Sequence, residues 1–281
     1  MMSPLVDLHI HTTHSDGTQS VQDVIDIAVQ QRLKAIAITD HDTVSGMPEA
    51  FAYIREKGLE LGLISGVELS TRFENLDVHV LGYCFDHDNQ DFLKIIEYYK
   101  LKREHRAEKI VDRLHELGFP VSMDLIREMA QSGSIGRPHI ARALVESGLM
   151  PSVDYAFNYY LGYYKPAYVH KEKLTPEQGI AYIHQAGGIA VLAHPGSYFS
   201  DPLLDQFLEF GLDGIEVFHP NHGNEMVMEL IKGAKKRNLL ITGGSDNHGS
   251  VKSDTYIGAI RVPYVFYEKL LAYHQNIKQT V

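Results

Sequence analysis

Residues 7–17 read Asp7-Leu-His-Ile-His-Thr-Thr-His-Ser-Asp-Gly17. The apolar run from Leu5 to Ile10 predicts a β-strand that leads into this stretch. Side chains two positions apart on a strand share a face, so His9 and His11 point the same way, with Asp7 beside them. Two imidazoles at one strand end can form half of a metal site. An isolated His-x-His pair more often lies on an exposed strand, so the rest of the chain must decide.

The composition is that of an ordinary soluble protein. The chain has 281 residues, 44% hydrophobic content, one cysteine and a formal charge of −10. This length suits one barrel-sized domain or a domain with a large insertion. The negative charge disfavours a general nucleic-acid surface, so we expect no stable DNA complex. A single cysteine, no signal peptide and no membrane-length apolar run lead us to expect a cytoplasmic protein.

Strand-type and helix-type runs alternate along most of the chain. The strand-type runs are residues 5–10, 34–39, 59–67, 78–82, 189–192, 214–218, 239–242 and 256–262. The helix-type runs between and after them are residues 20–32, 47–57, 176–185, 203–210, 225–237 and 265–276. This alternation predicts an α/β barrel, in which active sites lie at the C-terminal ends of the strands.

The pattern breaks between residues 91 and 164, where helical runs and a tyrosine-rich connection replace the alternation. We predict a helical insertion (cap) subdomain at 91–164 and a barrel domain made of 1–90 and 165–281. Such an insertion either covers the active-site rim as a lid or only stabilises the fold, and the sequence favours neither. The tyrosines are candidates for stacking a base, but the core of the insertion is the more ordinary role.

Residues with ligand-type side chains follow separate strand runs. The set is His9, His11, Asp16, His41, Glu68, His194, His219, His222, Asp246 and His248, with His79 inside a strand. In a barrel these positions converge on one rim, which makes coincidence a poor explanation.

At these residues the chain resembles the polymerase-and-histidinol-phosphatase (PHP) family of metal-dependent phosphoesterases. The matching segments are His9-x-His11, Ser15-Asp-Gly17, Thr39-Asp-His-Asp42, Gly66-Val-Glu68, His79-x-x-Gly82, Ala193-His-Pro195 and Ser245-Asp-Asn-His248. The resemblance implies a distorted (β/α)7 TIM-like barrel (PHP fold) with two or three divalent ions, and mixed nitrogen and oxygen ligands suit Mn, Fe or Zn.

The resemblance also implies a ligand set. One ion would be held by His9, His11, Glu68 and Asp246. A second would share Glu68 and add His79 and His194, and a third would be held by Asp16, His41 and His248. At the third site His14 is the alternative to Asp16, and we prefer Asp16 because Ser-Asp-Gly matches one branch of the family.

Three residues are candidates for contact with substrate. Arg137 and His139 resemble an arginine–histidine pair that faces the substrate in that branch, and arginine suits phosphate as a two-pronged donor. The alternative is a helix N-terminus with Pro138 in its first turn. His222 is a candidate for binding phosphate or protonating the leaving oxygen, and with Asp246 it is our predicted catalytic residue.

We therefore predict a phosphoesterase that hydrolyses phosphate monoesters of nucleotides by a hydroxide that bridges two cations. The resemblance points to 3′,5′-bisphosphonucleotides, converted to the 5′-monophosphate, or to short oligoribonucleotides trimmed from the 5′ end. The alternatives are a histidinol-phosphate phosphatase and a non-catalytic, metal-stabilised accessory module. The expected partners are a small phosphorylated substrate and short RNA, without a membrane.

Overall fold

The computed structural model describes residues 4–130, 134–170, 174–251 and 255–280, and it contains two β-sheets. The first sheet has the strand order β3-β2-β1-β9. Its strands are β1 (Leu5–Ile10), β2 (Ala35–Ile38), β3 (Gly62–Ile64) and β9 (Val262–Pro263). The first three are parallel, as the helical crossovers predict, and β9 pairs antiparallel with β1. The predicted last strand at 256–262 is therefore wrong except at its end.

The second sheet has the order β4-β5-β6-β7-β8. Its strands are β4 (Gly66–Phe73), β5 (Leu76–Tyr83), β6 (Ile189–Leu192), β7 (Gly214–Phe218) and β8 (Leu240–Gly243). β4 and β5 form an antiparallel hairpin, and β5 also runs antiparallel to β6. The run 59–67, predicted as one strand, thus contains β3 and the first residues of β4, which belong to different sheets. Gly66 permits this change of sheet, because a Cβ there would lie 2.3 Å from the Ile38 carbonyl oxygen.

Two isolated bridges join the sheets at the ends of their strands. Ile10 pairs with Asn247 beyond β8, and His41 pairs with Glu68 in β4. Backbone hydrogen bonds continue each seam, including Asp246 N–H to the His9 carbonyl at 2.8 Å. The described residues therefore form two sheets joined at these bridges. The strand pairing of the described residues does not close into a barrel. Both seams lie where ligand-type residues gather.

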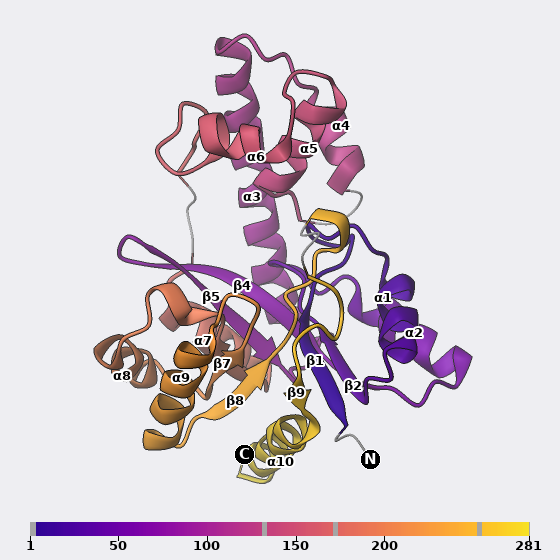
Figure 1. Cartoon of the computed structure of the whole chain (residues 1–281), viewed down its shortest axis with the longest axis vertical. Helices are drawn as coiled ribbons and strands as arrows, with labels where there is room; N and C mark the ends of the chain where they lie inside the picture. The colour runs from indigo at the N-terminus through magenta and orange to yellow at the C-terminus, as the bar shows by residue number, and fades with distance from the viewer. Residues whose placement is uncertain (1–3, 131–133, 171–173, 252–254, 281) are drawn as a thin grey trace.

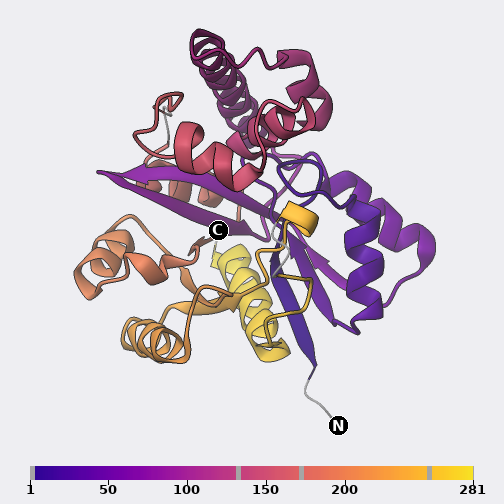
Figure 2. The ribbon, with the colours of Figure 1, turned by 45° about the horizontal axis from the view of Figure 1, so that its top comes forward.

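Helices cover the outer faces of the sheets (Figures 1 and 2). They are α1 (Val21–Gln30), α2 (Met47–Lys57), α7 (Pro176–Gln185), α8 (Asp201–Glu209), α9 (Asn224–Lys236) and α10 (Tyr264–Thr280). α1 begins with a capping box in which the side chains of Ser20 and Asp23 each bond the other's backbone N–H. α2 ends at Gly58 in the left-handed conformation, as predicted for a glycine C-cap. Apolar side chains of α1, α2, α7, α8 and α9 pack on the sheets in one cluster, and those of α10 pack on the sheets in a second cluster.

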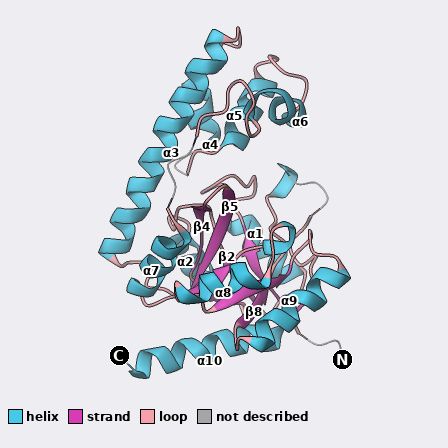
Figure 3. Ribbon diagram, turned by 90° about the vertical axis from the view of Figure 1, so that its left-hand side faces the viewer, coloured by secondary structure: helices cyan, strands magenta, loops and turns pink. Residues whose placement is uncertain are grey.

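The segment between β5 and α7 projects from one end of the sheets (Figures 1 and 3). Its elements are α3 (Gln90–Glu116), α4 (Met123–Ala130), α5 (Arg137–Glu146), α6 (Val153–Ala156) and the π-helix η1 (Phe157–Leu161). The first turns of α3 pack into the sheet core through Phe92 and Ile96. The rest of the segment has a separate apolar cluster, which includes Leu114, Ile126 and Leu144. α3 thus links two apolar clusters. None of the described helices is long and apolar enough to cross a membrane.

Candidate metal centre

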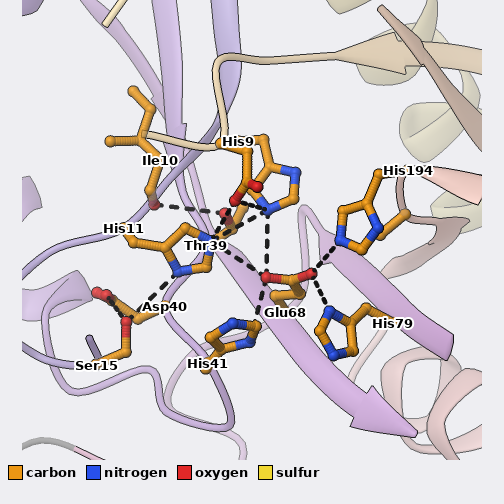
Figure 4. Close-up of polar contacts among 12 residues, drawn as sticks. His9, Ile10, His11, Ser15, Thr39, Asp40, His41, Glu68, His79 and His194 are labelled. Carbon is orange, nitrogen blue, oxygen red and sulfur yellow. Dashed lines mark hydrogen bonds and ion pairs between the residues drawn. The ribbon is translucent and has the colours of Figure 1, made fainter. Parts of the chain in front are cut away.

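Glu68 lies at the centre of a buried cluster of imidazoles (Figure 4). One carboxylate oxygen, Oε2, lies 3.2 Å from His9 Nε2, 3.1 Å from His11 Nε2 and 3.2 Å from His41 Nδ1. The other, Oε1, lies 2.7 Å from His79 Nδ1 and 3.0 Å from His194 Nε2. The strand β4 supplies Glu68 with its side chain fixed at the seam between the two sheets. This one carboxylate therefore faces ligand-type atoms from five other positions.

Three donor atoms converge beside Glu68 Oε2 and form a group of four with it. Asp246 Oδ1 lies 3.4 Å from His9 Nε2 and 3.2 Å from His11 Nε2, and the two nitrogens lie 3.1 Å apart. Donors about 2.1 Å from one first-row ion are separated by about 3.0–3.4 Å. The residues His9, His11, Glu68 and Asp246 therefore fit a divalent ion. His9 lies in β1 and His11 directly follows its last residue, Ile10, so both histidines point to one side, as the two-residue spacing predicts.

A second group surrounds Glu68 Oε1. His79 comes from β5, directly opposite β4 in the hairpin, and His194 follows β6. His194 and Asp246 both have left-handed backbones, with φ values of 27° and 48°. Non-glycine residues rarely adopt this conformation, and such strain clusters at functional sites. The same strained turns direct both side chains into the cluster.

A third group consists of Asp16, His41, His248 and His11, whose nearest ligand atoms all lie within 4.8 Å of one another. Asp16 Oδ1 lies 3.3 Å from His248 Nε2 but, like His41 Nδ1, is buried without a hydrogen-bond partner among the described residues. Buried polar atoms normally have partners. Two such atoms in one group of ligand-type residues fit a cation.

His14, the alternative to Asp16, lies apart from this group. Its Nδ1 lies 2.8 Å from Ser45 Oγ and its Nε2 lies 3.3 Å from Glu49 Oε2. The geometry therefore favours Asp16 as the donor for a third ion. It also adds His11 Nδ1, 3.9 Å from Asp16 Oδ1, which the predicted third ligand set did not include.

The cluster strongly shifts the charges of its members. Burial opposes ionisation of Glu68, but the neighbouring imidazoles, His41 and His79 first, lower its pKa well below the usual value. Burial also opposes a charged His11, yet hydrogen bonds to Asp246 and Glu68 raise its pKa to about 9. For His41 burial dominates, and its pKa falls well below the usual value. Carboxylates are thus held ionised, which is the state that binds cations.

Glu216 is a functional residue that the sequence analysis missed. It is fully buried in β7, and its Oε1 lies 2.9 Å from His9 Nδ1. Its Oε2 accepts a hydrogen bond from the His194 backbone N–H at 2.9 Å. A carboxylate that holds the far nitrogen of a ligating histidine fixes the ring's orientation. The available signal was a glutamate inside an otherwise apolar strand.

The other acidic neighbours bind the loops rather than the imidazoles. Asp7 accepts hydrogen bonds from the backbone N–H groups of Ser245 and Gly258, at 2.9 and 2.8 Å. Asp40 accepts from the backbone N–H of Thr12 at 2.7 Å and from the Ser15 hydroxyl at 2.6 Å. Both carboxylates therefore secure the loops that carry the ligand-type residues.

A cavity of about 240 Å³ opens beside the third group and is lined by Asp16, His41 and His79 on one side. Arg137 lines its other side together with two arginines of α3 that the sequence analysis missed, Arg103 and Arg106. The two α3 residues are three positions apart, so they share a helix face. Long helices carry many such pairs, which is why the spacing alone gave no signal.

The three guanidinium groups bind a carboxylate, a hydroxyl and two carbonyl groups of the described residues. Arg103 donates to Asp42 and Ser70, at 2.5 and 2.6 Å. Arg137 donates to the Leu161 carbonyl, and Arg106 donates to the carbonyl of Val169. Burial, then the charges of the other two arginines, lowers the pKa of Arg106 to about 10. Crowded cations of this kind favour an anion in the cavity.

His139 and His222 make contacts that limit their predicted roles. His139 is buried, accepts a hydrogen bond from the Gly136 backbone N–H at the start of α5, and does not line the cavity. Burial lowers its pKa to about 4. The His222 Nε2 accepts from Gly196 N–H at 3.1 Å, so its Nδ1–H donates to the Val217 carbonyl at 2.9 Å. In this conformation His222 directs no N–H at a substrate.

Comparisons with known proteins agree with this site. The PHP domain family model matches residues 7–161. The Escherichia coli "5'-3' exoribonuclease Rnm" is 36% identical over 87% of this chain and 85% of its own. A Chromobacterium violaceum "3',5'-nucleoside bisphosphate phosphatase" is 30% identical over 90% of each. An Eggerthella lenta "Phosphoribosyl 1,2-cyclic phosphate 1,2-diphosphodiesterase" is 33% identical over 92% and 98%.

A solved structure from Bifidobacterium adolescentis, described as a metal-dependent phosphoesterase, has the same fold. Its TM-score is 0.88 and its sequence identity 32%, with 96% of this chain and 97% of the other chain covered. Nearly the whole length of this chain thus corresponds to that structure.

Proposed function

The chain belongs to the PHP domain family and is a hydrolytic, metal-dependent phosphoesterase, and from this premise we propose its substrate class. We propose that it removes the 3′-phosphate of 3′,5′-bisphosphonucleotides or trims short oligoribonucleotides from their 5′ end. The observation that carries this proposal is the cavity with three arginines directly beside the Glu68 cluster. A substrate with one phosphate at the cluster and a second anion in the cavity uses both features.

The names of the relatives support this substrate class. The Escherichia coli relative is named for 5′-3′ exoribonuclease activity, and the Chromobacterium violaceum relative for nucleoside bisphosphate phosphatase activity. Both kinds of substrate carry two phosphates separated by one nucleoside. We infer that Arg137, with Arg103 and Arg106, binds the phosphate that is not hydrolysed.

We further infer three divalent ions, of Mn, Fe or Zn. The first would be held by His9, His11, Glu68 and Asp246; the second by Glu68, His79 and His194; and the third by Asp16, His41 and His248. When bound, such ions polarise phosphoryl oxygens and lower the pKa of water. Glu216 would keep the His9 ring oriented, and the deep burial of the cluster would exclude other nucleophiles.

The reaction is a hydrolysis. Oxygen from water bonds to phosphorus, the phosphorus–oxygen bond to the sugar breaks, and the sugar oxygen gains a proton. The arginine cavity holds the substrate's second anion and so fixes the direction of the breaking bond. If His222 is the proton donor, as the sequence analysis proposes, its contact with Gly196 has to open first.

A cyclic phosphodiester is the second candidate substrate. The Eggerthella lenta relative is named for a phosphoribosyl cyclic phosphate, and this chain matches 98% of that relative's length. A phosphoribosyl group would also place a second phosphate among the arginines. Histidinol phosphate, by contrast, carries a protonated amine, which Arg103, Arg106 and Arg137 would repel. The cavity thus disfavours the histidinol-phosphate alternative.

A substrate comparison tests the proposal. The metal-loaded protein is assayed at equal concentrations of adenosine 3′,5′-bisphosphate, a 5′-phosphorylated dinucleotide, a phosphoribosyl 1,2-cyclic phosphate and histidinol phosphate. We expect kcat/KM to be highest for one of the first two. Preference for histidinol phosphate or the cyclic ester would refute the assignment.

The arginine cavity has its own matched control. Arg137→Gln should raise KM for adenosine 3′,5′-bisphosphate by about ten-fold or more, because a charged hydrogen bond is lost. Arg127→Gln removes an arginine from α4 that pairs with Glu104 and Glu108 outside the cavity, and it should leave KM unchanged. Equal effects of the two substitutions would remove the cavity from the proposal.

We also infer that the two sheets are parts of one distorted (β/α)7 barrel and that residues 91–164 form a cap over its rim. The bridges Ile10–Asn247 and His41–Glu68 support the first inference, since they continue hydrogen bonding between the sheets. The separate apolar cluster of the insertion, and Arg137 in the same cavity as Asp16, support the second.

A further inference from the structure

A second cavity, of about 640 Å³, adjoins the candidate metal centre, and the substrate class proposed above gives it no role. We propose that this cavity binds the nucleoside that follows the scissile phosphate of an oligoribonucleotide, with its base stacked on tyrosine. The proposal deepens the proposed function, because it takes a 5′-phosphorylated oligoribonucleotide as the substrate of the same site.

The position of this cavity is the first argument. It reaches His194, whose Nε2 lies 3.0 Å from Glu68, and it shares Asp77 and Tyr163 with the arginine cavity. The two cavities therefore reach the Glu68 cluster through different histidines, His79 in the first and His194 in the second, and Tyr163 forms part of both walls. A substrate with its scissile phosphate at the cluster and its terminal phosphate among the arginines continues into the second cavity.

The chemistry of the two cavities differs. The arginine cavity has three guanidinium groups, whereas the described lining of the second cavity contains no lysine or arginine. Its walls instead present the rings of Tyr163, Tyr164 and Tyr198 and the amides of Asn75 and Asn221. Aromatic rings stack on bases of any sequence, and amides bond to base edges. The lining suits a nucleoside better than a second phosphate.

Tyr164 gives the most specific indication. Its side chain is 86% exposed, and its backbone has φ = 60°, a conformation that bulky residues rarely adopt. The ring centroid lies 6.3 Å from that of Tyr163 and 6.4 Å from that of Tyr168, yet so exposed a ring gains little from burial, so packing contributes little to holding a tyrosine in this strained turn. A stacked base would cover this ring.

Tyr159 provides the contrast within the same segment. It is also exposed, at 58%, but it lies in η1 with its ring centroid 4.6 Å from that of Tyr155. It is absent from the lining of both cavities. Tyr159 is therefore a control for the general effect of removing an exposed tyrosine ring from the insertion.

The test compares two substrates that differ only in the downstream nucleoside: adenosine 3′,5′-bisphosphate and the 5′-phosphorylated dinucleotide pApA. Tyr164→Ala should lower kcat/KM for pApA by about ten-fold, because one base–aromatic stack is lost. It should leave kcat/KM for the bisphosphate unchanged, and Tyr159→Ala should change neither value. Equal losses on both substrates, or no loss on pApA, would overturn the proposal.

A change in the substrate gives an independent result that does not depend on any variant. The wild-type protein should hydrolyse a dinucleotide with an abasic downstream residue about ten-fold less efficiently than pApA. Equal efficiency would overturn base stacking.

Failure of the proposed function gives a different signature, namely no turnover of the bisphosphate or of pApA by wild-type protein. The subsite is then judged from equilibrium binding of pApA. Weaker binding by Tyr164→Ala than by Tyr159→Ala supports it, and equal binding overturns it.

Discussion

At the scale of single residues, Glu68 organises the site. Its two oxygens lie within 3.2 Å of nitrogens from His9, His11, His41, His79 and His194. A carboxylate buried at 1% exposure among five imidazoles would be costly unless cations or protons balance the group. The motif Gly66-Val-Glu68 allowed Glu68 to be predicted from the sequence. Glu216 was not predictable in this way, because a lone glutamate in a strand has many ordinary roles.

The choice between Asp16 and His14 can be tested by counting ions. Asp16→Asn should lose about one bound ion per chain, because the buried Asp16 Oδ1 faces His248 and has no hydrogen-bond partner among the residues that the structure describes. His14→Gln should retain the wild-type number, because its ring contacts Ser45 and Glu49. Metal content is measured by mass spectrometry after gel filtration. The reverse result would make His14 the ligand.

Glu216 should act through His9. Glu216→Gln keeps the shape of the side chain but weakens its hold on the His9 Nδ1, so metal affinity should fall by about 10- to 100-fold. The exposed Glu209, on α8, serves as the control in Glu209→Gln. Titration with a competing chelator gives both affinities. If Glu216→Gln bound metal with the wild-type affinity, Glu216 would not act through His9.

At the scale of elements, the seams between the sheets decide where the ligand-type residues meet. β1 and the loop after β8 approach so closely that a Cβ at Gly244 would lie 2.3 Å from the His9 backbone nitrogen. The helices were predicted well, and α2, α7, β6 and β7 have the predicted bounds. The seams were not predicted, because strand pairing across distant segments leaves no periodic signal in one sequence.

Gly244 tests the importance of the β1–β8 seam. Gly244→Ala should displace His9 and lower both the unfolding temperature and the metal content, with a loss of stability of about 1–3 kcal/mol from overpacking. Gly223→Ala is the control, since a Cβ at Gly223 meets nothing within 4 Å. Thermal unfolding and metal analysis are carried out on both. Equal behaviour of the two variants would show that the seam tolerates a methyl group.

At the scale of the whole molecule, the site joins parts of the chain that are far apart in sequence. The cluster takes donors from β1, β4, β5 and the segments after β2, β6 and β8, so it crosses both sheets. The insertion adds Arg103, Arg106 and Arg137 from one side. Bound ions would therefore stabilise the arrangement of the two sheets as well as take part in the reaction.

Metal removal tests this coupling. Ions present at about 1,000 times their dissociation constant would add about 4 kcal/mol. Chelation should then lower the unfolding temperature by about 10 °C, and the effect should shrink at acidic pH as ligating histidines take up protons. Glu68→Gln is the control, and its unfolding temperature should barely respond to chelator. An unchanged wild-type temperature would separate the ions from the stability of the fold.

The sequence by itself determined the helices, most of the strands, the family and the identity of the residues that gather around Glu68. These features have local signals: helical spacing, apolar runs and short motifs at strand ends. Only the tertiary structure decided that β4 and β5 form a hairpin, that Glu216 holds His9, that Asp16 rather than His14 faces His248, and that α3 brings two arginines to the cavity. Each of these depends on contacts between residues distant in the chain, whose geometry is fixed by packing and not by spacing.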